Sequence, residues 1–214
     1  MTATPNEPTP EPTELERAWQ AHIDQSTELL DRLVVRHRER QRRYHRIDHV
    51  EAVLRHVDEL AATEPVDDLG AVVAAAFYHD AVYEPTHPAN ESASARLARR
   101  DLARLGWPAD RVERVATMIE ATRDHAAAPD VDTAVLFDAD LAILGAEPPS
   151  YRDYATRVRA EYAHVDDHGW RSGRAGVLQG LLDRETIFHT ATGRRRWDEA
   201  ARRNIGDELA ALRG

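Results

Sequence analysis

Two adjacent polar residues, His79 and Asp80, follow directly after an almost wholly apolar stretch that runs from Leu69 to Tyr78. An imidazole and a carboxylate in an apolar core cost free energy unless each is hydrogen-bonded, paired with a charge or bound to a metal. A hard divalent cation would satisfy both side chains at once. The pair therefore predicts a metal site, provided that other segments supply the remaining ligands.

Histidine and aspartate recur in two other segments of the chain. His45 and His49 are four residues apart, so they share one face wherever this segment is helical. Asp138 and Asp140 lie in a second apolar stretch, and on a helix Asp138 should point away from Asp140. The order histidine, histidine-aspartate, aspartate extends over about 90 residues, which is typical of a site inside a helical bundle.

This ordered set resembles the signature of the HD superfamily of metal-dependent phosphohydrolases, and most closely its small branch of predicted HD phosphohydrolases. A His-Asp dipeptide alone would carry no weight, but the ordered set is specific. The positions that carry the signature are His49, His79, Asp80 and Asp140. The resemblance extends from roughly Trp19 to Leu212, nearly the whole chain, and its matching segments are residues 44–49, 76–83, 90–95, 119–125, 138–145 and 201–209.

The resemblance implies that His49, His79, Asp80 and Asp140 hold a divalent metal ion. Two imidazoles and two carboxylates suit octahedral coordination, with positions left for water and a substrate oxygen. The ion is left open among Mn²⁺, Fe²⁺, Co²⁺, Mg²⁺ and Zn²⁺. A zinc-peptidase helix is excluded, because Arg46 stands where its glutamate should follow the first histidine. A hydrogen-bonded polar cluster without metal is the alternative.

Two acids are candidates for orienting the attacking water. Glu84 lies four residues after Asp80, where related phosphohydrolases keep such an acid. Glu91 belongs to the segment after Pro88, which should overhang the metal; it could equally be an acid that stabilises the first turn of a helix. Asp80 itself could also align the water. A solvated loop glutamate is the alternative for Glu84.

Three further residues are candidates for contacts with substrate. The resemblance implies that His45 lies behind the metal ligands or touches the phosphate, and that His125 contributes a phosphate contact. Asn90 is a candidate substrate contact, although it could simply cap a helix. A histidine such as His125 at the end of a helix can also simply interact favourably with the helix dipole.

The chemistry implied is hydrolysis of a phosphomonoester, with a nucleotide or a related small phosphate ester as substrate. A bound cation would act as Lewis acid and lower the pKa of a bound water toward ~7. One alternative is pyrophosphate hydrolysis of the alarmone (p)ppGpp, but such enzymes carry His-Asp-x-x-Glu-Asp, and this chain has Tyr83 at the first acidic position. Another alternative is a non-catalytic module that binds a nucleotide or a protein.

Composition agrees with a folded cytoplasmic domain. The chain has 214 residues, a net charge of −10 and no cysteine. The negative charge argues against a nucleic-acid polymer as partner. No apolar run approaches the ~18 residues that span a bilayer, and no signal sequence is recognisable, so we expect no membrane association. A small phosphorylated substrate is the expected partner, and a homodimer is left open.

These residues must be positioned by helices, because the apolar pattern follows the helical period and no alternating strand pattern occurs. We expect an all-α fold, a single HD-type bundle of roughly eight or nine helices with a central metal site. The first helix should be long and carry apolar residues from Leu15 to Leu33. The second helix should carry both His45 and His49. A third should run from residue 67 or 68 to 83. Residues 1–12 read as a disordered proline-rich tail, and residues 13–214 as the HD-type domain.

Overall fold

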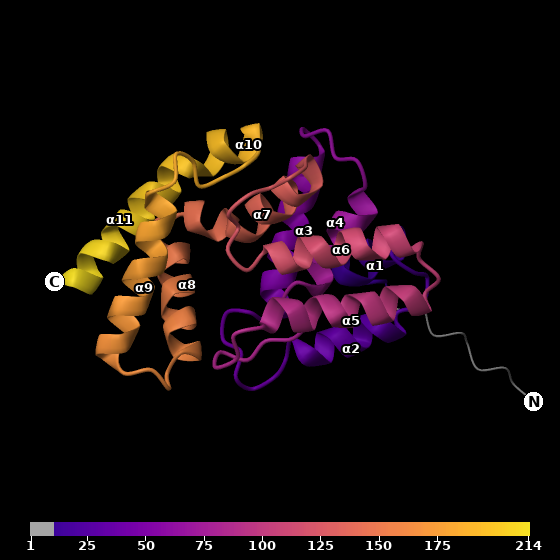
Figure 1. The fold of residues 1–214 in the computed structure, drawn as a ribbon, viewed down its shortest axis with the longest axis horizontal. Helices are drawn as coiled ribbons and strands as arrows, with labels where there is room; N and C mark the ends of the chain where they lie inside the picture. The colour runs from indigo at the N-terminus through magenta and orange to yellow at the C-terminus, as the bar shows by residue number, and fades with distance from the viewer. Residues whose placement is uncertain (1–10) are drawn as a thin grey trace, which may run out of the picture.

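The computed structural model describes residues 11–214, and all regular elements among these residues are helical (Figure 1). The prediction of an all-α fold is therefore confirmed. The predicted tail over residues 1–12 falls almost entirely outside the described residues. The helices are α1 (Glu14–His22), α2 (Glu28–Arg36), α3 (Ile47–Ala61), α4 (Leu69–Tyr78), α5 (Asn90–Arg104), α6 (Ala109–Ala121), α7 (Val131–Leu141), α8 (Pro148–Glu161), α9 (Asp167–Leu182), the short α10 (Ala191–Gly193) and α11 (Glu199–Arg213).

Helix α4 forms the centre of the core. All of its residues from Ala71 to Tyr78 are buried, and it packs against α1, α3, α6 and α7. Its first turn is capped by Asp68, whose carboxylate accepts a hydrogen bond from the backbone N–H of Ala71 at 3.0 Å. Because α4 is apolar on all sides, His79 and Asp80 at its end enter the middle of the bundle.

The sequence predicted a helix that ends near Tyr83, but α4 already ends at Tyr78. The backbone N–H of Val82 donates to the hydroxyl of Ser94 at 3.0 Å and not to the carbonyl of Tyr78, which interrupts the helical ladder. The fully buried guanidinium of Arg42 binds the turn that follows. It donates to the carbonyl of Asp80 at 2.7 Å and to that of Ala81 at 3.4 Å, so these carbonyls do not continue a helical ladder. The chain therefore turns immediately after the His-Asp pair.

The predicted first helix is two helices. The chain breaks between α1 and α2, where the indole N–H of Trp19 donates to the carbonyl of Ser26 at 2.9 Å. This contact folds the linker back over a tryptophan that is 0% exposed. The split raises the number of long helices within residues 11–214 to ten, close to the eight or nine expected.

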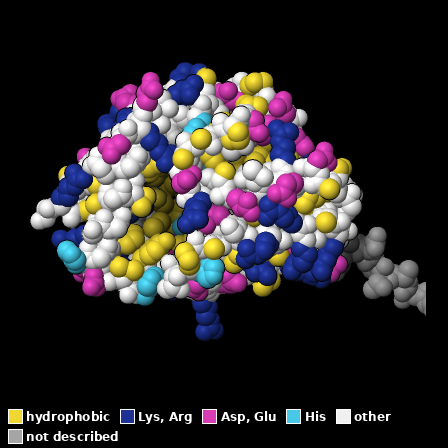
Figure 2. Space-filling model, viewed as in Figure 1, with side chains coloured by type: hydrophobic (Ala, Val, Ile, Leu, Met, Phe, Trp, Pro, Cys, Tyr) yellow, Lys and Arg dark blue, Asp and Glu magenta, His cyan; other side chains and the backbone are white. Residues whose placement is uncertain are grey.

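Helices α8, α9 and α11 gather at one end of the molecule, and α1 to α7 form the rest (Figure 1). Between the two groups the visible face is hollowed, and hydrophobic side chains gather there (Figure 2). Helix α7 ends at Leu141, and the chain continues as a 3₁₀ turn from Ala142 to Gly145. A Cβ on Gly145 would lie 2.5 Å from Cβ of Trp197, so this close approach requires glycine.

Candidate metal centre

Histidine and aspartate side chains from three helical segments converge on one point in the bundle. His49 comes from α3, His79 and Asp80 follow α4, and Asp140 comes from α7. These helices are mutual neighbours. Each helix directs one or two polar side chains toward the region where α3, α4 and α7 meet. The spacing in the sequence predicts this arrangement for a site inside a bundle.

The distances among these side chains fit a shared ion. Nε2 of His49 lies 3.2 Å from Nε2 of His79 and 3.1 Å from Oδ1 of Asp140. Oδ2 of Asp80 lies 3.2 Å from Nε2 of His79. Ligand atoms about 2.1 Å from one ion and at right angles to each other stand about 3 Å apart. Ligand atoms of His49, His79 and Asp140 all lie within 4.8 Å of one another, so this group can hold a metal ion.

Hydrogen bonds behind the ligands fix which atoms face the site. Nδ1 of His79 donates to the carbonyl of Ala76 at 2.9 Å, so Nε2 is the nitrogen that faces the site, where a metal ion would take the place of its proton. Nε2 of His125 donates to Oδ2 of Asp140 at 2.9 Å, so Oδ1 is the oxygen left near His49. Such outer contacts orient metal ligands and hold them in the correct tautomer.

The charges in this cluster support one another. Burial acts to lower the pKa of His79, but the carboxylates of Asp80 and Asp140 outweigh it and raise that pKa well above the ordinary value. Burial acts to raise the pKa of both carboxyl groups, yet the imidazole of His79 holds both pKa values below the usual range. Asp80 and Asp140 are therefore ionised at neutral pH, which is the form that binds a cation.

A cavity of about 290 Å³ opens beside the ligands. His45, Asn90, Glu91 and His125 all line it, so the structure brings these four predicted residues to the same space as His79, Asp80 and Asp140. The other residues around the cavity are Tyr83, Pro85, His87, Pro88, Thr122, Arg123 and Tyr162. Their roles stay predictions, and the structure shows only that they line one cavity beside the metal-binding group.

Glu84 is placed differently from the other candidates. It is exposed and is not among the residues that line the cavity. Its carboxylate accepts a hydrogen bond from the hydroxyl of Thr86 at 3.2 Å. The side chain of Asn90 binds the backbone of Glu84 through both its oxygen and its nitrogen, at 3.1 and 3.0 Å, which closes the loop before α5. Asn90 is the first residue of α5 and not its predicted cap.

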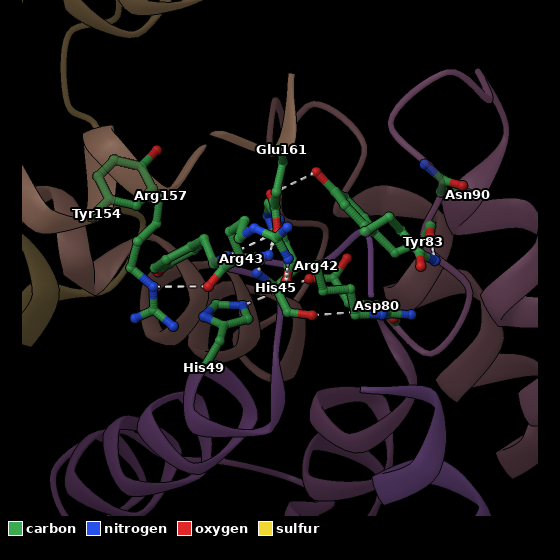
Figure 3. Close-up of polar contacts among 12 residues, drawn as sticks. Arg42, Arg43, His45, His49, Asp80, Tyr83, Asn90, Tyr154, Arg157 and Glu161 are labelled. Atoms are coloured by element: carbon green, nitrogen blue, oxygen red, sulfur yellow. Dashed lines mark hydrogen bonds and ion pairs between the residues drawn. The ribbon is translucent and has the colours of Figure 1, made fainter. Parts of the chain in front are cut away.

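The sequence predicted that His45 and His49 lie on the same helix, one turn apart. In the structure His45 precedes α3. The helix begins only at Ile47, because the backbone of Arg46 is extended, with φ −106° and ψ −176°. The backbone N–H of His45 donates to the carboxylate of Glu161 at 3.0 Å. Figure 3 shows His45 near both His49 and Asp80, with Glu161 on its other side. The imidazole therefore reaches the site from the turn before the helix.

His125 has a strained backbone. Its φ is +49°, a left-handed conformation that residues other than glycine rarely adopt. Its carbonyl accepts hydrogen bonds from Nη1 of Arg184 at 2.7 Å and from Nε2 of His189 at 3.2 Å. The segment after α9 thus holds the strained residue whose ring contacts Asp140, and strain maintained in this way is typical of functional sites.

Asp138 points away from the cluster, as expected from its position two residues before Asp140. Its carboxylate accepts hydrogen bonds from the backbone N–H groups of His189 and Thr190, at 2.7 and 2.8 Å, and from the hydroxyl of Thr190 at 2.6 Å. Burial raises its pKa, and these donors act in the opposite direction. Asp138 therefore anchors the segment that contacts His125.

No known protein family, curated protein or solved structure matches the chain. Among the described residues, none of the helices is long and apolar enough to cross a membrane. Three residues around His45 were not recognised as site residues from the sequence, and they are Arg42, Tyr83 and Glu161. No local motif marks Glu161, because the backbone N–H groups that it binds are more than a hundred residues away.

Proposed function

We propose that the chain is a metal-dependent phosphohydrolase of the HD type, which hydrolyses a phosphomonoester such as a nucleotide or a related small phosphate ester. The convergence of His49, His79 and Asp140 within 4.8 Å, at the edge of a polar cavity, is the observation that carries the proposal. Asp80 supplies a fourth donor. Their order along the chain is the order in which the HD signature places its ligands.

The donor set is suited to a hard divalent ion. Two imidazole nitrogens and two carboxylate oxygens, with no thiolate, favour Mn²⁺, Fe²⁺, Co²⁺ or Mg²⁺, and Zn²⁺ is compatible. When bound, such an ion supplies Lewis acidity and makes a bound water acidic enough to yield hydroxide near neutral pH. The four side chains hold it at the cavity, where a phosphate group can reach it.

The residues of this chain then have distinct tasks. Glu91 lines the cavity from the first turn of α5 and would orient the attacking water through its carboxylate. Arg123, His45 and His125 line the same cavity and would place positive charge or N–H donors against the phosphate oxygens. This arrangement would stabilise the charge that develops on the phosphate during hydrolysis.

The size of the cavity supports a small substrate. A space of about 290 Å³ lies at the small end of the range typical of ligand pockets. The net charge of −10 also disfavours a long polyanion, which would need a basic face. A small phosphate ester fits these two observations better than a nucleic-acid polymer.

A substrate panel tests the proposal. The purified protein is incubated with nucleoside monophosphates, sugar phosphates, p-nitrophenyl phosphate and an alarmone, each with Mn²⁺, Co²⁺ or Mg²⁺. We expect phosphate release from at least one monoester, loss of activity with chelator, and no activity in Asp140→Asn. Pyrophosphate release from the alarmone alone would favour the pyrophosphohydrolase alternative. A metal-loaded protein that hydrolyses none of these compounds would instead be a binding module.

A further inference from the structure

Glu161, the last residue of α8, is a buried acid that the proposed chemistry does not use directly. Its carboxylate side chain is 0% exposed and accepts five hydrogen bonds. Burial acts to raise its pKa, but the hydrogen bond and the charge of His45 and the backbone N–H donors outweigh burial and lower that pKa to about 2. Glu161 is therefore an ionised acceptor at neutral pH.

One oxygen of Glu161 gathers the turn that precedes α3. Oε1 accepts from the backbone N–H groups of Arg43, Tyr44 and His45 at 2.7, 2.8 and 3.0 Å. Successive N–H groups that point at one anion fix the local backbone, as in other anion-binding turns. Helix α3 starts two residues later, so Glu161 also sets the direction in which His49 enters the site.

The other oxygen of Glu161 holds the ring of His45. Nδ1 of His45 donates to Oε2 at 2.7 Å, and the hydroxyl of Tyr83 donates to the same oxygen at 2.9 Å (Figure 3). The rings of His45 and Tyr83 are stacked with centroids 4.3 Å apart. The imidazole is thus fixed at one nitrogen and along one face, and Nε2 is the nitrogen left for the cavity.

We infer that Glu161 is a positioning residue of this site, which orients His45 and keeps a proton on its Nδ1, so that the ring protonated on both nitrogens donates from Nε2 to the substrate phosphate. The contact with phosphate rests on the proposed function, but the control of the tautomer does not. A carboxylate behind an imidazole acts in this way in many enzymes, because it decides which ring nitrogen carries the proton. Glu161 therefore links α8 to chemistry on the far side of His45.

Replacement by glutamine tests this inference, because an amide has only one acceptor atom. In Glu161→Gln the amide oxygen should face the three backbone N–H groups, which would repel an amide nitrogen. The amide nitrogen then faces Nδ1 of His45 and donates to it. The single ring proton must then lie on Nε2, and the ring can no longer be protonated on both nitrogens, so it brings no positive charge to the phosphate.

A matched control is available in α11. Glu208 is also largely buried, and its carboxylate accepts from the guanidinium of Arg174 at 2.8 Å and from the hydroxyl of Tyr151 at 2.6 Å. It does not line the cavity. Glu208→Gln therefore removes a comparable charged hydrogen-bond acceptor and should lower the thermal midpoint without changing His45.

The first measurement is the long-range ¹H–¹⁵N NMR spectrum of the histidine side chains in metal-free protein, in alkaline solution where the imidazoles are neutral. The His45 signal is assigned with His45→Gln. We expect the proton on Nδ1 in wild type and in Glu208→Gln, and on Nε2 in Glu161→Gln. An Nε2–H ring in wild type would overturn the inference even if the Glu161 variant did not fold, and so would an unchanged tautomer in Glu161→Gln.

The second measurement is hydrolysis of p-nitrophenyl phosphate with Mn²⁺. Glu161→Gln should lower kcat by about 10- to 100-fold while bound Mn²⁺ per chain stays at the wild-type value, and Glu208→Gln should keep wild-type kcat below its thermal midpoint. Equal losses in both variants would show that Glu161 only stabilises the fold. If wild type hydrolyses no ester, the proposed function fails, and the tautomer shift still decides the role of Glu161.

Discussion

Nε2 of His49 and Nε2 of His79 face each other at 3.2 Å inside the bundle. Because Nδ1 of His79 already donates to the carbonyl of Ala76, Nε2 is the ring nitrogen that faces His49, and a metal ion would displace the proton from it. A cation between the two nitrogens would satisfy both, and the ionised carboxylates of Asp80 and Asp140 lie where they would balance its charge. The relationship between these two rings is therefore the structural basis of the predicted metal centre.

Metal content is the first prediction. Purified protein should carry about one divalent ion per chain, and Asp80→Ala should lose it, because removal of one ligand leaves the remaining buried charges uncompensated. Elemental analysis of both proteins, after dialysis against the same metal-free buffer, gives the result. Wild-type metal content in Asp80→Ala would remove Asp80 from the ligand set.

The neighbouring acids Asp138 and Asp140 should behave in opposite ways. Asp138→Asn should keep its metal but lower the free energy of unfolding by about 1–3 kcal/mol, because buried N–H and hydroxyl donors lose an ionic acceptor. Asp140→Asn should lose the metal. Denaturant melts and elemental analysis of the two variants separate the roles. Loss of metal in Asp138→Asn, with the fold intact, would contradict this division.

Glu91 and Glu84 are the two candidates for orienting the water. Because Glu91 lines the cavity and Glu84 does not, Glu91→Gln should reduce kcat by roughly 10²-fold, with metal still bound. Glu84→Gln should keep kcat within about threefold of wild type, well short of the loss expected for a residue that takes part in proton transfer. Steady-state kinetics of both variants at saturating Mn²⁺ measures the difference. A large loss in Glu84→Gln alone would mean that the loop moves to bring Glu84 into the site.

Acid sensitivity of the fold should depend on His37. This residue is 1% exposed, and burial, with the positive charge of Arg42, lowers its pKa from 6.5 to about 4. Between these two values the unfolded chain binds a proton that the folded chain does not, so stability falls as pH decreases through this window. The full effect would be on the order of 3 kcal/mol, and it is absent above the unfolded pKa.

His37→Leu should therefore flatten the dependence of unfolding free energy on pH between about 6.5 and 4. Denaturant melts across this range give the slope. The control is His168→Leu at an exposed histidine, which should retain the wild-type slope. Parallel curves for wild type and His37→Leu would show that other groups cause the acid sensitivity.

The sequence predicted the elements whose signals are local. The apolar stretch that became α4, its cap at Asp68 and the polar residues at its end could be recognised because a continuous buried run needs no tertiary information. The same holds for α9, whose bounds of Asp167–Leu182 agree with the predicted range of residues 167–182. The cluster of His49, His79 and Asp140 followed from their types and order.

Features that depend on distant contacts could not be predicted. Glu161 meets the backbone of Arg43 across 118 residues, and nothing in its neighbourhood marks it as a buried acceptor. Arg42 holds the turn after α4 through carbonyls 38 and 39 residues away. The break between α1 and α2 depends on where the indole of Trp19 finds a partner. Each of these contacts overrides a local helical preference through tertiary hydrogen bonding.

Reconstitution of metal-free protein tests the central claim most directly. Chelator-treated wild type and Asp140→Asn are titrated with Mn²⁺, and the rate of p-nitrophenyl phosphate hydrolysis is recorded against the number of bound ions. The metal-centre account predicts no hydrolysis without metal, a rate that rises in proportion to occupancy up to about one ion per chain, and no recovery in Asp140→Asn. Hydrolysis by metal-free wild type, or recovery in Asp140→Asn equal to that of wild type, would contradict it.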